Sequence, residues 1–81
     1  MKYYVYVLQS KKDGKLYKGL AKDPHVRLKQ HNAGKTKSTK YYRPWILVLT
    51  EEFPTRELAR KREIFLKSGD GRQYLKRLLD P

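Results

Sequence analysis

Five side chains with complementary chemistry occur along this sequence in an order that could bring them to one phosphate group. They are two phenols, a guanidinium, an imidazole and a carboxylate, contributed by Tyr6, Tyr17, Arg27, His31 and Glu63. Hydrolysis of a phosphodiester requires an activated water, stabilisation of the charge that builds on the phosphoryl oxygens, and help for the departing oxygen. Each of the five groups can meet one of these needs, so the sequence predicts a phosphate site.

The carboxylate stands in a strongly basic segment, since Glu63 lies among Arg60, Lys61, Arg62 and Lys67. If it faces a cleft, it can hold one Mg²⁺ or Mn²⁺ ion that keeps several waters and also binds a phosphate, because Mg²⁺ typically needs few carboxylates. The alternative is a surface ion pair with Lys67, which is common and contributes little stability. On composition alone the ion pair is the favoured interpretation.

The guanidinium and the imidazole are four residues apart, so Arg27 and His31 share one face of any helix that carries them. A planar guanidinium suits bidentate contact with phosphate oxygens. A neutral His31 could accept or relay a proton, whereas a cationic one would hold phosphate. The alternatives are a solvated helix surface for Arg27 and a capping or surface role for His31.

The two phenols could together activate and orient the attacking water. Tyr17 is the candidate general base, directly or through a water, and Tyr6 assists it or orients the nucleophile. A tyrosine normally titrates near pH 10, and adjacent cations favour its phenolate. Because the chain has seven tyrosines, packing is a serious alternative for any one of them.

The elements that would position these residues can be predicted from local patterns. Residues 3–9 are rich in aromatic and β-branched types, Asp13-Gly14 supplies a turn, and residues 16–20 return, so a hairpin is expected. Asp23-Pro24 begins a helix that ends near Asn32. The Gly19 position, beside Tyr17, should permit close backbone approach.

The second half of the chain predicts one strand and two helices. Residues 45–50 form the strongest apolar run, which suits a central strand. Thr55 can cap a helix that Gly69 ends, and residues 71–79 form a third helix. The expected order is ββαβαα in one domain over residues 1–81, a three-stranded antiparallel sheet flanked by helices in the α/β (α+β) class.

The charge of the chain predicts its partner. Twenty Lys and Arg against eight Asp and Glu give a formal charge of +12, so a polyanion is expected. No segment approaches the roughly 18 apolar residues of a membrane span and no signal-peptide core is present, so we expect a soluble, cytoplasmic protein that enters no membrane. The absence of cysteine excludes disulfides and thiolate metal ligands.

An aperiodic basic segment, residues 35–44, is expected to be an exposed loop. Its cations alternate with Tyr41 and Tyr42, so it could follow a nucleic-acid backbone and stack on bases, or be a solvated loop. The predicted nucleic-acid contacts are Lys18, Lys35, Lys37, Lys40, Arg43 and Lys67.

The order of these short motifs resembles the GIY-YIG nuclease superfamily. The resemblance rests on Tyr4-Val5-Tyr6, Tyr17-Lys18-Gly19, Arg27, His31-Asn32 and a helical Glu63, and it extends from Tyr3 to about Leu75. Within the superfamily, the chain is most similar to small single-domain proteins. Tyr4 replaces the first glycine of the family name, and Lys18 stands where an apolar residue is usual; we expect Lys18 to point away from the face of Tyr17.

The resemblance implies a divalent-metal-dependent endonuclease that cleaves DNA, with RNA as the alternative. It makes Glu63 the ligand of Mg²⁺ or Mn²⁺, Arg27 the group that stabilises the phosphoryl charge, Tyr17 and Tyr6 the groups that activate water, and His31 an assisting residue. The rival readings are a non-catalytic nucleic-acid-binding module and a protein-interaction domain whose charge serves solubility. A protein partner that supplies targeting is also expected.

Overall fold

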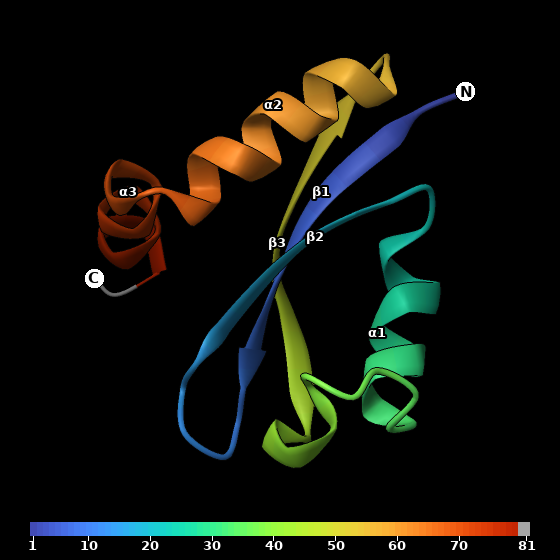
Figure 1. Ribbon diagram of the computed structural model, residues 1–81, viewed down its shortest axis with the longest axis vertical. Helices are drawn as coiled ribbons and strands as arrows, with labels where there is room; N and C mark the ends of the chain where they lie inside the picture. The colour runs from blue at the N-terminus through green and yellow to red at the C-terminus, as the bar shows by residue number, and fades with distance from the viewer. Residues whose placement is uncertain (80–81) are drawn as a thin grey trace.

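The computed structural model describes residues 1–79, which form one sheet with helices on both of its faces (Figure 1). The elements follow the predicted order ββαβαα, with one added 3₁₀ turn, η1: β1 (Tyr3–Ser10), β2 (Leu16–Ala21), α1 (Pro24–Asn32), η1 (Lys40–Tyr42), β3 (Trp45–Phe53), α2 (Arg56–Lys67) and α3 (Gly69–Leu79). The predicted α+β class and antiparallel sheet are therefore confirmed. Within the described residues, no helix has the length and apolar character needed to cross a bilayer.

The central strand of the sheet is β1, because the strand order is β2-β1-β3. The prediction that residues 45–50 form the central strand was wrong, since β3 lies at an edge. Burial explains the difference: Val5, Tyr6, Val7 and Leu8 are at most 1% exposed, which is possible only for a strand covered on both faces. The apolar run of β3 is divided between the two faces: Trp45 and Leu47 pack in the core with Tyr6, and Val48 and Leu49 pack against the core with α2.

Each face of the sheet has its own core. On one face Val5 and Val7 pack with Ala59 and Leu66 of α2 and Leu75 of α3. On the other face, Tyr6, Leu8 and Trp45 pack with partners that include Tyr17 and Leu28. Figure 1 shows α1 on one side of the sheet and α2 with α3 on the other. Successive residues of a strand therefore contribute to different cores.

The segment between α1 and β3 is anchored more firmly than an exposed loop would be. Asn32 bridges to the backbone of Trp45, accepting from its N–H at 2.7 Å and donating to its carbonyl at 3.0 Å. The indole N–H of Trp45 donates to the carbonyl of Thr39 at 2.9 Å. The expectation of a wholly exposed loop over residues 35–44 was wrong at Thr39, which is 1% exposed because its side chain satisfies polar groups inside.

A tight junction joins α2 to α3. Ser68 ends α2, and its hydroxyl accepts from the backbone N–H of Gly71 at 3.2 Å, which caps the start of α3. A Cβ at Gly71 would collide with the backbone carbonyl of Phe65 and the Cα of Leu66. The junction therefore requires a residue without a side chain at position 71.

We predict opposite effects of alanine at the two glycines that begin α3. Gly71→Ala should destabilise the fold by about 1–3 kcal/mol, because the backbone it meets cannot move aside as a flexible side chain can. Gly69→Ala is the matched control: its Cβ would meet nothing within 4 Å, so it should leave stability unchanged or raise it by up to about 1 kcal/mol. Urea unfolding of both variants measures the difference, and equal stabilities would contradict this view of the junction.

Candidate functional site

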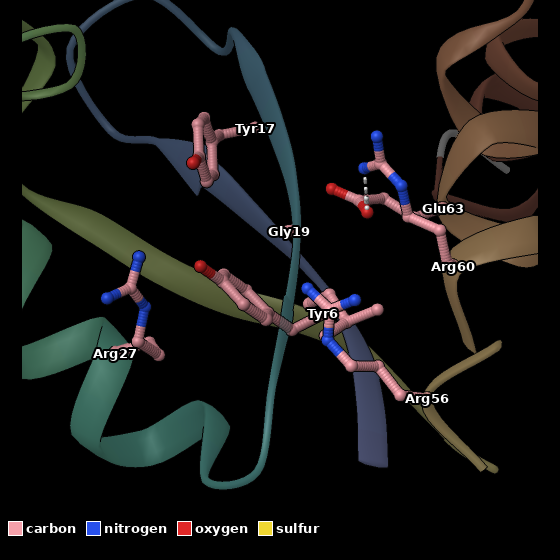
Figure 2. A pocket seen from close by; sticks show the side chains of 8 residues that line it. Tyr6, Tyr17, Gly19, Arg27, Arg56, Arg60 and Glu63 are labelled. Carbon is pink, nitrogen blue, oxygen red and sulfur yellow. Dashed lines mark hydrogen bonds and ion pairs between the residues drawn. The ribbon is translucent and has the colours of Figure 1, made fainter.

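A hollow of about 210 Å³ lies at the unpaired edge of β2 and brings together residues from both faces of the sheet. Figure 2 shows the phenols of Tyr6 and Tyr17 with Arg27 on one side of β2, and Glu63 with Arg60 on the other. The lining residues are Tyr6, Tyr17, Gly19, Leu20, Arg27, Arg56, Arg60 and Glu63. Four of the five predicted catalytic residues therefore line one hollow.

Gly19 lets the Tyr6 ring lie directly against β2. The two residues are paired across the β1–β2 ladder, and a Cβ at position 19 would be 2.5 Å from the Cζ and hydroxyl oxygen of Tyr6. The expected close approach at this glycine is thus made by an aromatic side chain of the site. A side chain at position 19 would displace the Tyr6 ring, so the hollow in this form requires glycine there.

A buried chain of polar side chains lies behind the hollow. The Tyr6 hydroxyl is 3.2 Å from His31 Nε2, and His31 Nδ1 is 2.8 Å from the hydroxyl of Thr39. Tyr6 and His31 are 0% exposed. The surface alternative for His31 is therefore wrong, because α1 turns this residue toward the sheet rather than toward solvent.

Burial fixes the direction of these hydrogen bonds. The hydrogen of a buried hydroxyl needs an acceptor, and within residues 1–79 His31 Nε2 is the acceptor that Tyr6 reaches. Nε2 must then carry no hydrogen, so Nδ1–H donates to Thr39, whose own hydroxyl donates to the carbonyl of Thr36 at 3.3 Å. Because the Tyr6 hydroxyl donates to His31, its oxygen can still accept a hydrogen bond through its lone pairs.

The environment keeps both groups neutral. Burial raises the pKa of Tyr6, and this outweighs the nearby guanidinium of Arg27, which lowers it. Burial, followed by the positive charge of Arg27, holds the pKa of His31 below its usual 6.5. The expectation that cations favour a phenolate does not hold for Tyr6, because desolvation is the larger effect, and His31 does not act as a resident cation at neutral pH.

Arg27 is positioned with part of its hydrogen-bonding capacity unused. One terminal NH₂ group donates to the amide oxygen of Gln30 at 3.0 Å. Its Nε–H, however, is buried without a partner among the described residues. The pKa of Arg27 is raised chiefly by Tyr6, so the guanidinium remains charged beside the phenol. Leaving a buried donor unpaired is costly, and an anion in the hollow would offer further acceptors to this group.

Glu63 is ion-paired and also faces the hollow. Its carboxylate accepts from Arg60 at 2.8 Å and from Lys67 at 3.0 Å, yet the side chain is 8% exposed and lines the hollow. Burial raises the pKa of Glu63, but the hydrogen bonds from Lys67 and Arg60 outweigh it and hold the pKa below 4.5. The ion pair with Lys67 therefore exists, but it is not an ordinary surface pair.

These residues fit a single divalent ion that takes most of its ligands from water and substrate. Within the described chain, no group of three or more His, Asp or Glu side chains is arranged to hold a metal. One carboxylate facing a hollow suits Mg²⁺, which usually keeps several waters and binds through one or two carboxylates plus phosphate oxygens. The ion would have to share Glu63 with Arg60 and Lys67, so tight binding requires the phosphate.

The predicted nucleic-acid contacts lie in two places. Lys18 and Lys67 are on the α2 side of β2, close to the hollow. The loop cations Lys35, Lys37, Lys40 and Arg43 do not line it. Arg43 also makes internal bonds, donating from Nε to the carbonyl of Lys40 at 2.7 Å.

Sequence reasoning missed three residues of the site. Arg56 and Arg60 line the hollow. They could have been found from the sequence, because their helical spacing from Glu63 places all three side chains on one face of α2. Thr39 was missed because nothing in an aperiodic loop indicates which residue turns inward.

Known proteins resemble this chain along most of its length. The model of the GIY-YIG catalytic domain matches residues 2–75. UPF0213 proteins of Staphylococcus saprophyticus and Staphylococcus epidermidis are 43% identical over 76 residues, which cover 93% of this chain and 92% of each relative. The solution structure of a UPF0213 protein from Bacillus halodurans is 38% identical, covers 96% of this chain and 85% of that one, and superposes with a TM-score of 0.58.

We predict that His31 is the neutral tautomer with its hydrogen on Nδ1. Ring ¹⁵N shifts should show a protonated Nδ1 and a bare Nε2 down to a pH below 6.5, since the pKa of His31 is lowered. Thr39→Ser keeps the acceptor and should preserve this pattern. Thr39→Val removes it and should lose the pattern or about 1–3 kcal/mol of stability, because a buried N–H is left unpaired. A protonated Nε2 in the unaltered protein would contradict the direction assigned above.

We predict that Glu63 stabilises the fold in a pH-dependent way. Its pKa is lowered in the folded protein, so its contribution is fully present above about pH 4.5 and is lost as pH falls through the folded pKa. Urea unfolding should therefore show a stability gap between the unaltered protein and Glu63→Gln at pH 7 that narrows in acid. Glu57→Gln, an exposed acid in the same helix, is the control and should show no such gap. A gap that is constant with pH would rule out this role of the ion pairs.

Proposed function

Since the chain belongs to the GIY-YIG family and to its UPF0213 group, we propose that it is an endonuclease that hydrolyses phosphodiester bonds in DNA with one divalent metal ion. The observation that carries the proposal is the shared hollow: two phenols, a partly unpaired guanidinium and a buried carboxylate meet across the edge of β2. A merely structural ion pair would not require these four groups to face the same space.

In this proposal the scissile phosphate lies between Arg27 and Glu63. Arg27 donates to its non-bridging oxygens and stabilises the charge that develops on them. The metal ion held by Glu63, Mg²⁺ or Mn²⁺, would act as a Lewis acid on the phosphate. The absent Cβ at Gly19 gives its space to the Tyr6 ring, which brings the Tyr6 hydroxyl to the hollow where the phosphate would lie.

The phenols and His31 handle the proton of the attacking water. The roles expected for the two phenols are exchanged here, because Tyr6 is the phenol hydrogen-bonded to His31: Tyr17, half-buried in the wall of the hollow, orients the water. The water proton passes to the Tyr6 oxygen while the Tyr6 hydroxyl proton passes to His31 Nε2, so the phenol stays neutral and His31 becomes the cation. This route suits a tyrosine whose pKa is raised, because a free phenolate is never formed. Thr39 accepts from Nδ1–H throughout.

A second candidate function is nucleic-acid binding without catalysis. It is favoured by one observation, the pairing of both Glu63 oxygens with cations, which leaves the carboxylate already neutralised. In that case the net charge of +12 and the cationic hollow would hold the phosphate backbone, and Glu63 would only order Arg60 and Lys67.

We predict metal-dependent cleavage that needs both sides of the hollow. Purified protein should nick plasmid and cut oligonucleotides with Mg²⁺ or Mn²⁺. Arg27→Ala should lower the single-turnover rate about 10²–10³-fold, the usual effect of removing one donor to a developing oxyanion. Glu63→Gln should remove the metal-stimulated rate. Lys29→Ala and Glu57→Gln, exposed residues of the same two helices, should cut like the unaltered protein.

The outcomes separate the candidate functions. Equal cutting by the unaltered protein, Arg27→Ala and Glu63→Gln would identify a contaminating nuclease and overturn the proposal. Salt-sensitive binding with no cutting by any form under any metal would establish the binding module instead. DNA and RNA substrates of matched sequence are tested side by side, since the proposed groups touch only the phosphate.

A further inference from the structure

One line of side chains on α2 runs along the edge of β2. Arg56, Arg60, Glu63 and Lys67 follow the spacing of successive turns, so they share a single line of the helix. The first three line the hollow, and Lys67 bonds to Glu63 at 3.0 Å. At about 1.5 Å per residue, the line is about 17 Å long, comparable with about five nucleotides of one B-form strand. It is therefore longer than one phosphate requires.

Lys18 of β2 and Arg72 of α3 lie near Lys67, at the α3 end of this line. Leu16 and Leu20 of β2 pack with the core beneath α2 and α3, and strand alternation places Lys18 on that face between them. Arg72 lines a second hollow together with Leu16, next to Lys18 on the same face. The positive charges of Arg72 and Lys67 are close enough to Lys18 to lower its pKa. The expectation that Lys18 points away from the face of Tyr17 is consistent with this placement.

The described residues supply no anion for these added cations. Neither Lys18 nor Arg72 takes part in an ion pair within residues 1–79, and Lys67 has only Glu63, which it shares with Arg60. Arg62, a half-buried cation of α2, is matched: it makes two bonds to Glu51, at 2.7 and 3.1 Å. Most cations of this basic chain also lack a carboxylate partner within its described part, so what distinguishes Lys18, Lys67 and Arg72 is that they lie near one another beside the hollow.

Holding these cations together is unfavourable in the protein alone. Burial, and then the charges of Arg72 and Lys67, lower the pKa of Lys18. Like charges at close range destabilise a folded protein, and a bound anion would remove that cost. Phosphate groups supply such anions at regular spacing.

We propose that Lys18, Lys67 and Arg72 bind the phosphates that flank the scissile one on the α3 side, so that the substrate strand lies along the edge of β2. The inference rests on the proposed function only in taking the phosphate between Arg27 and Glu63 as its reference point. The ligand is the backbone of a nucleic-acid strand, DNA or RNA. The loop cations of residues 35–43 lie away from this path and contribute less.

The test measures binding without cleavage. Fluorescently labelled single-stranded DNA and RNA of one sequence are titrated in EDTA at several salt concentrations, with Lys18→Met, Arg72→Gln and the control Lys61→Met. Lys61 is a cation of α2 that points away from the line. Each lost phosphate contact should reduce the slope of log K against log salt by about 0.7, so Lys18→Met and Arg72→Gln should each show this reduction on both ligands, and Lys61→Met should not.

The outcomes decide the inference separately from the proposed function. Unchanged slopes in both Lys18→Met and Arg72→Gln, or an equal reduction in Lys61→Met, would overturn it even if cleavage is observed. Reduced slopes with no cleavage by any form would uphold phosphate binding by Lys18 and Arg72 while the nuclease proposal fails. Thermal melting checks that the variants fold. Since removal of Lys18 relieves repulsion, Lys18→Met should melt no lower than the unaltered protein. If Lys18→Met does not fold, Arg72→Gln tests the phosphate contacts independently.

Discussion

The bare edge of β2 at Gly19 is the constraint on which the site depends. A sheet separates the side chains on its two faces, so a carboxylate on α2 and a guanidinium on α1 can share a ligand only around an edge or through the sheet. At Gly19 the Tyr6 ring lies where a side chain would otherwise project, and the hollow extends past the strand to both faces. The strand order β2-β1-β3 leaves this edge free, whereas β1 is covered on both sides. The hollow at this edge thus brings together side chains from the two faces of the sheet.

Electrostatics then gives the two halves of the site different characters. On the α1 side, a phenol and an imidazole are buried as neutral groups in a chain of hydrogen bonds that ends at Thr36. On the α2 side, one acid is surrounded by cations, which keep it ionised in spite of its burial. The neutral half is suited to moving a proton and the charged half to holding an anion. Because Glu63 is shared by two cations, any metal bound there competes with them, and a phosphate that draws those cations away would favour the metal.

Much of this could be predicted from the sequence because the signals were local. Asp23-Pro24, Thr55 and the Gly14 turn define the ends of elements through short-range bonds and backbone preference. The position of β3 could not be predicted, since an apolar run reports burial but not which strand lies between the other two. His31 was expected to lie near the site, but its complete burial follows from tertiary packing. Thr39 gave no signal, because the inward turn of one loop residue depends on contacts with distant residues.

The most direct test of the central claim is paramagnetic broadening by Mn²⁺ in the presence of a short, uncleavable phosphorothioate oligonucleotide. If one phosphate and one metal ion are held across the β2 edge, the amide signals of Gly19 and Glu63 should broaden first, together with the side-chain signal of Arg27. Glu63→Gln should abolish that selective broadening. Broadening centred elsewhere on the protein, or unchanged broadening in Glu63→Gln, would contradict the claim that the two faces of the sheet form one site.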